Sequence, residues 1–120
     1  MTPYERLTEW EACRKWLVPA LVEDTEADVL NELFLNRAQL WRGDNAAFVT
    51  QLLTMPDEPA IVVWLGGGDM RGLLAMQPGI EAWARMQGAK AAWINGRTGW
   101  ARALRKAGFK PVGDELRKAL

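Results

Sequence analysis

The stretch that decides the fold is "AIVVWLGGGDMRGLLAMQPGIEAWARMQGAKAAWIN", residues 60–95. Six apolar residues, 60–65, are followed by three glycines and then by apolar residues that recur every three or four positions. A continuous apolar run indicates a strand covered on both faces, whereas the three-to-four spacing indicates an amphipathic helix. We therefore predict strand 60–65, helix 69–87 and strand 92–95, with the two strands parallel and joined by a right-handed crossover.

The predicted crossover helix carries its own start and stop signals. Asp69 is placed to cap its first turn, and Gly88 is placed to end it. Pro78 lies in its interior, where proline removes a backbone N–H and its ring clashes with the preceding turn. We expect a kink at Pro78, or a division into two helices.

Two helices and a meander are expected before this stretch. Apolar residues recur at helical spacing over residues 4–22, and Pro19 is expected to kink or end that helix. Thr25 precedes an acidic turn and is the expected cap of a second helix. The segments "AQLWR", "AAFVTQLL" and "AIVVWLGG" are separated by the turn-forming "GDN" and "MPDEP", so they predict an antiparallel meander.

After the stretch, the sequence predicts one more helix and a last strand. The segment "GRTGWARALRKAG" has Thr98 as its candidate cap and Gly108 at its end, and "FKPVG" begins a final extended segment. The expected order of elements is α-α-β-β-β-α-β-α-β. The fold class is therefore α/β (α+β): a single domain over residues 1–120, with a mixed, mostly antiparallel sheet and helices on both faces.

Composition limits the class of protein. The chain has 120 residues, of which 49% are hydrophobic and 25% charged, which suits one folded domain rather than a disordered or membrane protein. Its longest apolar run is too short to span a bilayer, and its first residues lack the apolar core of a signal peptide. We expect a cytoplasmic protein without a membrane partner.

Histidine is absent, and Cys13 is the only cysteine. This excludes an intrachain disulfide, a cysteine-cluster or histidine-ligated metal site, and Ser-His or Cys-His nucleophile pairs. We expect no metal site. Cys13 is interpreted as a small core residue rather than a reactive thiol.

Charge is unevenly distributed although the net charge is zero. Residues 1–84 hold six basic and thirteen acidic side chains, whereas residues 85–120 hold nine basic and two acidic ones. The cationic C-terminal third is suited to phosphates, nucleic acid or an acidic protein. The alternative is a solvated helix face that the acidic N-terminal part balances. Sequence-specific reading of nucleic acid is not expected, because no zinc-finger, RNA-binding or helix-turn-helix pattern is present.

Three segments carry a resemblance to a known family: "IEAWARMQGAKAAWINGR", "GRTGWARALRKAGF" and "RALRKAGFKPVG". Over residues 39–112 the chain resembles the GNAT family of N-acetyltransferases, and more narrowly the small GNAT-like proteins that bacteriophages encode. The resemblance implies a central strand that ends in glycines and exposes backbone groups to the pantetheine arm of acetyl-CoA. It also implies a loop whose amides bind the pyrophosphate at a helix start.

Carried onto this chain, the acyl-CoA site comprises Val63, Trp64, Leu65, Gly66, Gly67, Gly68, Asp69, Met70, Arg71 and Gly72. The loop "GGGDMRG" departs from the family pattern, because it is shorter and because Asp69 places a negative charge where the pyrophosphate would lie. Family enzymes often use a tyrosine near the last helix as an acid, but this chain has Trp100 in that region and its only tyrosine, Tyr4, is distant. Asp57 and Glu58 are candidate bases, although a solvated turn is the better interpretation of both. No catalytic residue is assigned.

The seven tryptophans are interpreted mainly as core residues, with Trp41 expected at the surface beside Arg42. An exposed aromatic next to arginine is a common interface pair, so interface and core are equally weighted there. On the last helix, Trp100 and Leu104 are four apart and share one face. The candidate interface residues are Trp41, Arg42, Arg97, Trp100, Arg102, Arg105 and Lys106.

Two functions follow from the resemblance. In the first, a GNAT-fold protein of bacteriophage type has a degenerate acyl-CoA site and acts on a protein partner, as a binding or virion-assembly component in the host cytoplasm or the virion. In the second, the chain is an active N-acyltransferase that uses acetyl-CoA as its cofactor and an amine as acceptor. The fold by itself does not choose between them.

Overall fold

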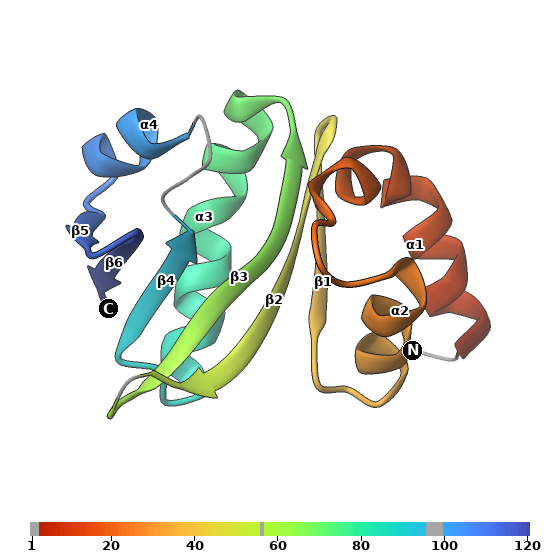
Figure 1. Cartoon of the computed structure of the whole chain (residues 1–120), viewed down its shortest axis with the longest axis horizontal. Coiled ribbons are helices and arrows are strands. Elements are labelled where there is room, and N and C mark those ends of the chain that lie inside the picture. The colour runs from red at the N-terminus through yellow and green to blue at the C-terminus, as the bar shows by residue number, and fades with distance from the viewer. Residues whose placement is uncertain (1–2, 56, 96–99) are drawn as a thin grey trace.

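The computed structural model describes residues 3–55, 57–95 and 100–120. Within these residues, six strands form one sheet in the order β1-β2-β3-β4-β6-β5 (Figure 1). The strands are β1 (Gln39–Gly43), β2 (Ala46–Thr54), β3 (Pro59–Gly68), β4 (Ala91–Asn95), β5 (Lys110–Val112) and β6 (Glu115–Ala119). The helices are α1 (Pro3–Leu17), the short 3-10 helix η1 (Val18–Ala20), α2 (Glu26–Phe34), α3 (Met70–Met86) and α4 (Ala101–Lys106).

The sheet is mixed and mostly antiparallel, as predicted. Strands β1, β2 and β3 form the expected antiparallel meander. Strands β3 and β4 are parallel, and α3 is the crossover between them. Strand β6 then runs antiparallel to β4, and β5 pairs with β6 at the edge. The strand 60–65 is therefore central, and the predicted parallel pair is confirmed.

Most of the predicted helix signals are confirmed. The Asp69 side chain caps α3 by accepting a hydrogen bond from the Arg71 backbone N–H, and Gly88 follows the helix with a φ of 90°. Thr25 caps α2 in a reciprocal capping box with Asp28. Helix α1 ends at Leu17, directly before the 3-10 turn that contains Pro19.

Of the two outcomes expected at Pro78, the division into two helices is wrong, whereas the kink stays a prediction. The helix continues through Pro78 without a division into two helices. Pro78 itself is exposed, while Leu73 and Ile80 on either side of it are buried against the sheet. Because tertiary packing supplies most of a helix's stability, the buried face holds α3 together across the one backbone bond that proline removes.

The C-terminal end also differs from the prediction. The final extended segment is a hairpin of two strands, β5 and β6, that turns at Gly113 with a φ of 61°. The sequence "ELRKA" has one large apolar residue, Leu116, and that residue is buried. A strand with a single buried apolar side chain gives too weak an alternation to be recognised.

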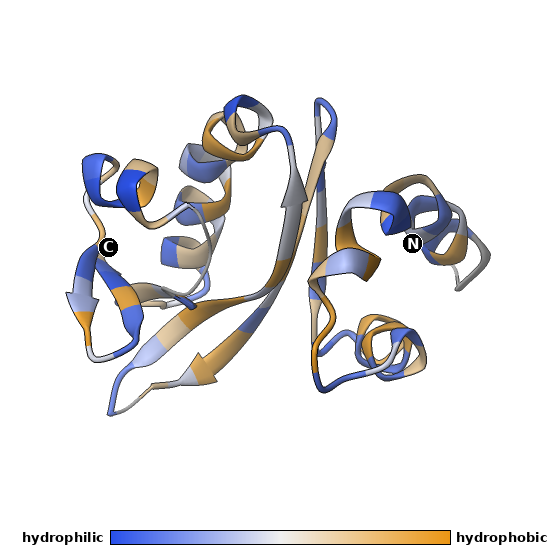
Figure 2. Cartoon of the chain, turned by 45° about the horizontal axis from the view of Figure 1, so that its top comes forward, coloured by the Kyte–Doolittle hydropathy of each residue, from blue (hydrophilic) through white to orange (hydrophobic). Residues whose placement is uncertain are grey.

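Hydrophobic residues fill both faces of the sheet. Helices α3 and α4 cover one face, where Phe48 and Ile61 are buried. Helices α1 and α2 cover the other face over β2 and β3, where Trp10 and Leu65 are buried, together with Cys13, which is fully enclosed as expected. Figure 2 shows hydrophobic and hydrophilic residues alternating along these helices. Over the described segments, no helix has both the length and the apolar character needed to cross a bilayer.

Candidate functional site

The parallel strands β3 and β4 part toward their carboxyl ends (Figure 1). They pair over Ala60, Ile61 and Val62, opposite residues 91–93, and the register goes no further. A β-bulge lies in β3 at the same level: Val49 of β2 is opposite Leu65 and Thr50 is opposite Val63, so Trp64 is an extra residue. Because a bulge increases local twist and bends its strand, this one helps to turn β3 away from β4.

A cleft of about 500 Å³ opens where the strands part. Its walls are the segment between η1 and α2, the end of β3, the end of β4 and the residue before α4. The described lining residues are Ala20, Leu21, Val22, Glu23, Asp24, Val63, Trp64, Leu65, Gly66, Ile94, Asn95 and Trp100. Four of the ten residues predicted for the acyl-CoA site therefore line one cleft, and the remaining six follow beyond it along the chain.

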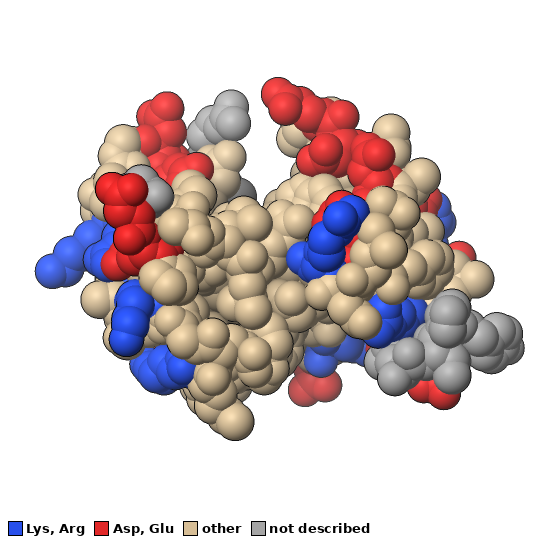
Figure 3. Space-filling view, turned by 90° about the horizontal axis from the view of Figure 1, so that it is seen from below, with Lys and Arg blue, Asp and Glu red and all other residues tan. Residues whose placement is uncertain are grey.

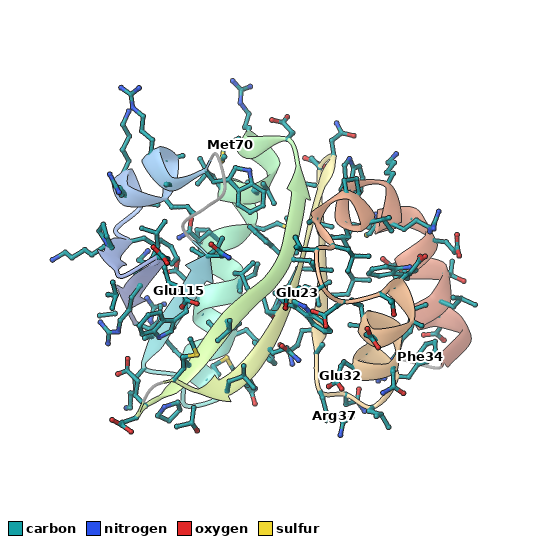
Figure 4. The ribbon with its side chains drawn as sticks, in the orientation of Figure 1. Glu23, Glu32, Phe34, Arg37, Met70 and Glu115 are labelled. Carbon is teal, nitrogen blue, oxygen red and sulfur yellow. The ribbon has the colours of Figure 1, made fainter. Side chains whose placement is uncertain are left out.

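The cleft is acidic. Glu23 and Asp24 belong to its lining, and none of its described lining residues is lysine or arginine. Across the cleft, Glu115 of β6 is the register partner of Asn95, a lining residue (Figure 4). Figure 3 shows acidic side chains on both sides of a hollow in the face that it views. Such a site favours cations over anions.

Two tryptophans shape the cleft. The indole N–H of Trp64 donates a hydrogen bond of 2.9 Å to the Asp24 carboxylate, which ties the η1–α2 segment to β3. The Trp100 ring packs edge-to-face on Phe48, with ring centroids 6.2 Å apart. A Cβ added at Gly66 would lie 2.8 Å from Trp100, so this indole stands directly against the backbone of the parted strand.

The glycines that follow make contact with the protein's own backbone. A Cβ added at Gly67 would lie 2.0 Å from the Trp16 carbonyl oxygen of α1, and one at Gly68 would lie 2.2 Å from the Asn45 carbonyl oxygen. A Cβ added at Gly72 would likewise lie 2.2 Å from the Asp44 carbonyl oxygen. These glycines let backbone approach backbone inside the fold. Close packing of the backbone therefore explains why glycine occupies these positions, without a bound ligand.

The first turn of α3 is capped by the Asp69 side chain. Met70 is the first helical residue and follows β3 after Asp69 alone, so no extended loop separates strand from helix. The Asp69 carboxylate lies 3.1 Å from the Arg71 backbone nitrogen, and the Asp69 N–H donates to the Asn45 carbonyl. Met70 is half-buried at this end of α3 (Figure 4), whereas Arg71 is exposed.

The predicted interface residues do not form one surface pair as expected. Trp41 is half-buried rather than exposed: its ring packs on Trp83 with centroids 5.4 Å apart, and its indole N–H donates to Thr50. Arg42 projects to the other face of the sheet and lies 3.7 Å from Glu9. The alternation of a β-strand separates the two neighbours. Arg97 lies outside the described residues, as does the predicted cap Thr98.

The last helix keeps its predicted character. Arg102, Arg105 and Lys106 are exposed on α4, while Leu104 is buried and Trp100 packs beside it on the same core. Of the two candidate bases, Asp57 is exposed. Glu58 forms an ion pair of 2.8 Å with Arg117 of β6, which engages its carboxylate.

Sequence reasoning missed the polar residues between α3 and β6. Glu81 lies on the core side of α3 with 5% exposure, and the Lys118 ammonium is 2.9 Å from its carboxylate. Arg85, one helical turn on, lies 3.8 Å from the same side chain. The spacing of Glu81 and Arg85 was the only available signal, and surface pairs show the same spacing. Burial is what distinguishes this cluster.

Among the described residues, no group of three or more acidic or cysteine side chains is placed to hold a metal ion. Comparison with protein-family models, with curated proteins and with solved structures gives no match for this chain.

Proposed function

We propose that this chain is a GNAT-like protein of bacteriophage type, that its acyl-CoA site is degenerate, and that it works as a binding or virion-assembly component. Its partner in this proposal is a protein, met in the host cytoplasm or the virion. The observation that carries the proposal is the charge of the cleft. Glu23 and Asp24 line it, and the described lining residues offer no cation.

Coenzyme A is a polyanion, so the carboxylates of the cleft and of Asp69 at the start of α3 would both repel it. A helix N-terminus binds phosphate through free N–H groups and a positive dipole end. Here Asp69 accepts one of those N–H groups and adds a negative charge at the same place. Two unit charges about 5 Å apart repel by roughly 3 kcal/mol at an effective dielectric constant of about 20.

The Trp100 indole also lies beside the backbone that a pantetheine arm would follow. Trp100 stands against Gly66 and Phe48, so a ligand that follows the backbone of β3 would have to displace this indole. Displacing it would cost an aromatic contact worth about 1 kcal/mol, in addition to the apolar area that it buries.

The experiment that tests this proposal is calorimetric titration with acetyl-CoA and with free CoA. We expect dissociation constants no lower than about 1 mM, equivalent to about 4 kcal/mol of binding free energy. The matched variant is Asp69→Asn, which keeps a capping side chain but removes its charge. Micromolar binding of either ligand to the wild type would overturn the proposal.

An active N-acyltransferase is the second candidate. The observation that favours it is the open cleft itself, because carboxylates beside it would attract a cationic amine acceptor. Holding donor and amine together is itself worth several kcal/mol, even without an acidic tyrosine. The test is release of free thiol from acetyl-CoA in the presence of a panel of amines. Turnover above the uncatalysed rate would favour the enzyme.

A further inference from the structure

A shallow groove of about 560 Å³ lies between α3 and α4, on the face of the sheet opposite the α1 and α2 layer. Its apolar part consists of Leu74 and Pro78 from α3 with Ala103 and Ala107 from α4 and its end. The small alanines leave space between the helices. This α3–α4 groove is separate from the cleft between β3 and β4.

The rim of the α3–α4 groove is cationic. Arg85, Lys106 and Lys118 border it, and Glu81 is the one carboxylate among the described lining residues. Lys118 is held by Glu81 at 2.9 Å, but Arg85 is 3.8 Å away, and Lys106 has no ion-pair partner among the described residues. A net positive groove with an apolar floor favours a segment that combines an apolar side chain with carboxylates.

One residue of the groove lining carries a buried polar atom without a partner. The side-chain nitrogen of Gln77 is buried and has no hydrogen-bond partner, and Gln77 belongs to the lining of the groove. A buried amide without a partner costs about 1 to 3 kcal/mol. This nitrogen is enclosed by the protein, so it does not add to the docking surface.

The chain itself carries a segment with the matching chemistry. Val22, between η1 and α2, is 93% exposed, and Glu23 and Asp24 follow it directly. The segment is held at its start by the bond from the Leu21 N–H to the Val18 carbonyl, and at its end by the bond between Asp24 and the Trp64 indole and by the capping box at Thr25. Figure 4 shows Glu23 in front of the central strands, away from α4. A preorganised segment loses little entropy when it binds.

We propose that copies of this chain associate head to tail, with residues 22–24 of one copy in the α3–α4 groove of the next. This inference rests on the proposed assembly function and names the partner as a second copy. Val22 fills the apolar floor, and the carboxylates of Glu23 and Asp24 meet Lys106 and Arg85. Segment and groove lie on opposite faces of the sheet, so the contact is heterologous and each dimer keeps one free segment and one free groove.

The experiment is sedimentation equilibrium from about 10 µM to about 1 mM protein, because a contact of this size is weak. We expect association at low salt and a decrease of about tenfold in the association constant at high salt, since exposed charges are screened there. The variants Glu23→Lys and Lys106→Glu are each expected to weaken self-association by about tenfold or more. Both positions are exposed, so neither change threatens the fold.

Mixing the two variants gives the sharpest test. The groove of Glu23→Lys keeps Lys106 and the segment of Lys106→Glu keeps Glu23, so the original pair can form in the mixture. The two substituted side chains also have opposite charges, so the reversed pair can form as well. We therefore expect the mixture to associate at least about tenfold more strongly than either variant alone. The matched controls are Glu11→Lys and Lys90→Glu, which make the same charge changes at exposed positions outside both surfaces and should associate as the wild type does.

Three results would overturn this inference: a wild type that stays monomeric at low salt, association that neither charge reversal weakens, or a mixture that fails to associate. A monomer that instead binds a glutamate-rich peptide through Lys106 would assign the groove to another protein. The titration with CoA is independent of these results. If the protein is monomeric and binds CoA weakly, the proposed function is retained and the head-to-tail contact is rejected. If it binds CoA at micromolar concentration and associates through Lys106, the proposed function is rejected and the contact is retained.

Discussion

At the scale of single residues, the contacts of the glycines at the end of β3 change the interpretation of these glycines. A run of glycines after a strand is typical of a phosphate-binding turn, because glycine lets backbone approach a ligand. Gly67 and Gly68 instead approach the carbonyl oxygens of Trp16 and Asn45. The same property of glycine therefore serves the packing of α1 and of the β1–β2 turn against β3.

Gly67→Ala is expected to destabilise the protein by at least about 2 kcal/mol, because the added Cβ would lie 2.0 Å from a backbone oxygen that no side-chain rotation can move. The measurement is urea denaturation. Gly79→Ala is the matched control, since Gly79 lies within α3 with nothing near its Cβ position, and it should gain about 0.5 to 1 kcal/mol. A Gly67→Ala variant as stable as the wild type would contradict this account of the glycine.

Glu26 gives the protein a specific dependence on pH. Hydrogen bonds from Arg14 and from the Trp10 indole lower the pKa of its carboxyl to about 2 from 4.5. Since the folded pKa is below the unfolded one, the stabilisation is complete above pH 4.5 and is lost as the pH falls toward 2. We expect Glu26→Gln to be less stable than the wild type at neutral pH and equally stable near pH 2. A difference that stays constant across a pH series of urea denaturation would contradict this.

At the scale of elements, α3 shows how packing overrides a local signal. Pro78 removes one backbone N–H from the middle of a 17-residue helix, yet the helix is continuous because its buried face is held against the sheet. Proline in a helix interior costs up to about 3 kcal/mol relative to alanine. That cost is present in the native protein and is offset by the core.

Pro78→Ala is therefore expected to raise the free energy of unfolding by about 1 to 3 kcal/mol, because alanine restores the backbone N–H and the site is exposed. The measurement is again urea denaturation, with the helical signal in circular dichroism as the probe. The gain should exceed that of Gly79→Ala one residue away. No gain, or a loss, would mean that the proline ring makes a contact on which the fold depends.

At the scale of the whole molecule, the buried pair of Glu81 and Lys118 joins α3 to β6 and so closes the C-terminal part of the sheet. Removing Lys118 leaves the buried Glu81 carboxylate with only the longer contact of 3.8 Å to Arg85, whereas replacing both members of a buried pair with apolar residues is often nearly neutral. Lys118→Met is expected to cost about 2 kcal/mol or more, and the double variant Glu81→Leu with Lys118→Met much less. Thermal unfolding of the two variants checks this. A double variant at least as unstable as Lys118→Met would contradict the expectation.

The accuracy of the sequence predictions followed the strength of the local signal. The apolar run of β3 and the capping residues Thr25 and Asp69 were each decided by neighbouring residues, and each was predicted correctly. The hairpin of β5 and β6 was not, because β6 has one buried apolar side chain. For the candidate site, Val63, Trp64, Leu65 and Gly66 line one cleft, and their assignment to acyl-CoA stays a prediction. The α3–α4 groove went unrecognised because its residues come from distant parts of the chain.

The sequence by itself determined the order of the elements up to α4, the parallel pair of β3 and β4, and the split between an acidic N-terminal part and a basic C-terminal part. These depend on periodicity, on capping and turn residues, and on composition, all of which act over a few positions. Only the tertiary structure decided that the glycines approach the protein's own backbone, that Trp100 stands in the parted strands and that Glu81 is buried beside Lys118. Those outcomes depend on which distant residues meet, and local patterns carry no information about such contacts.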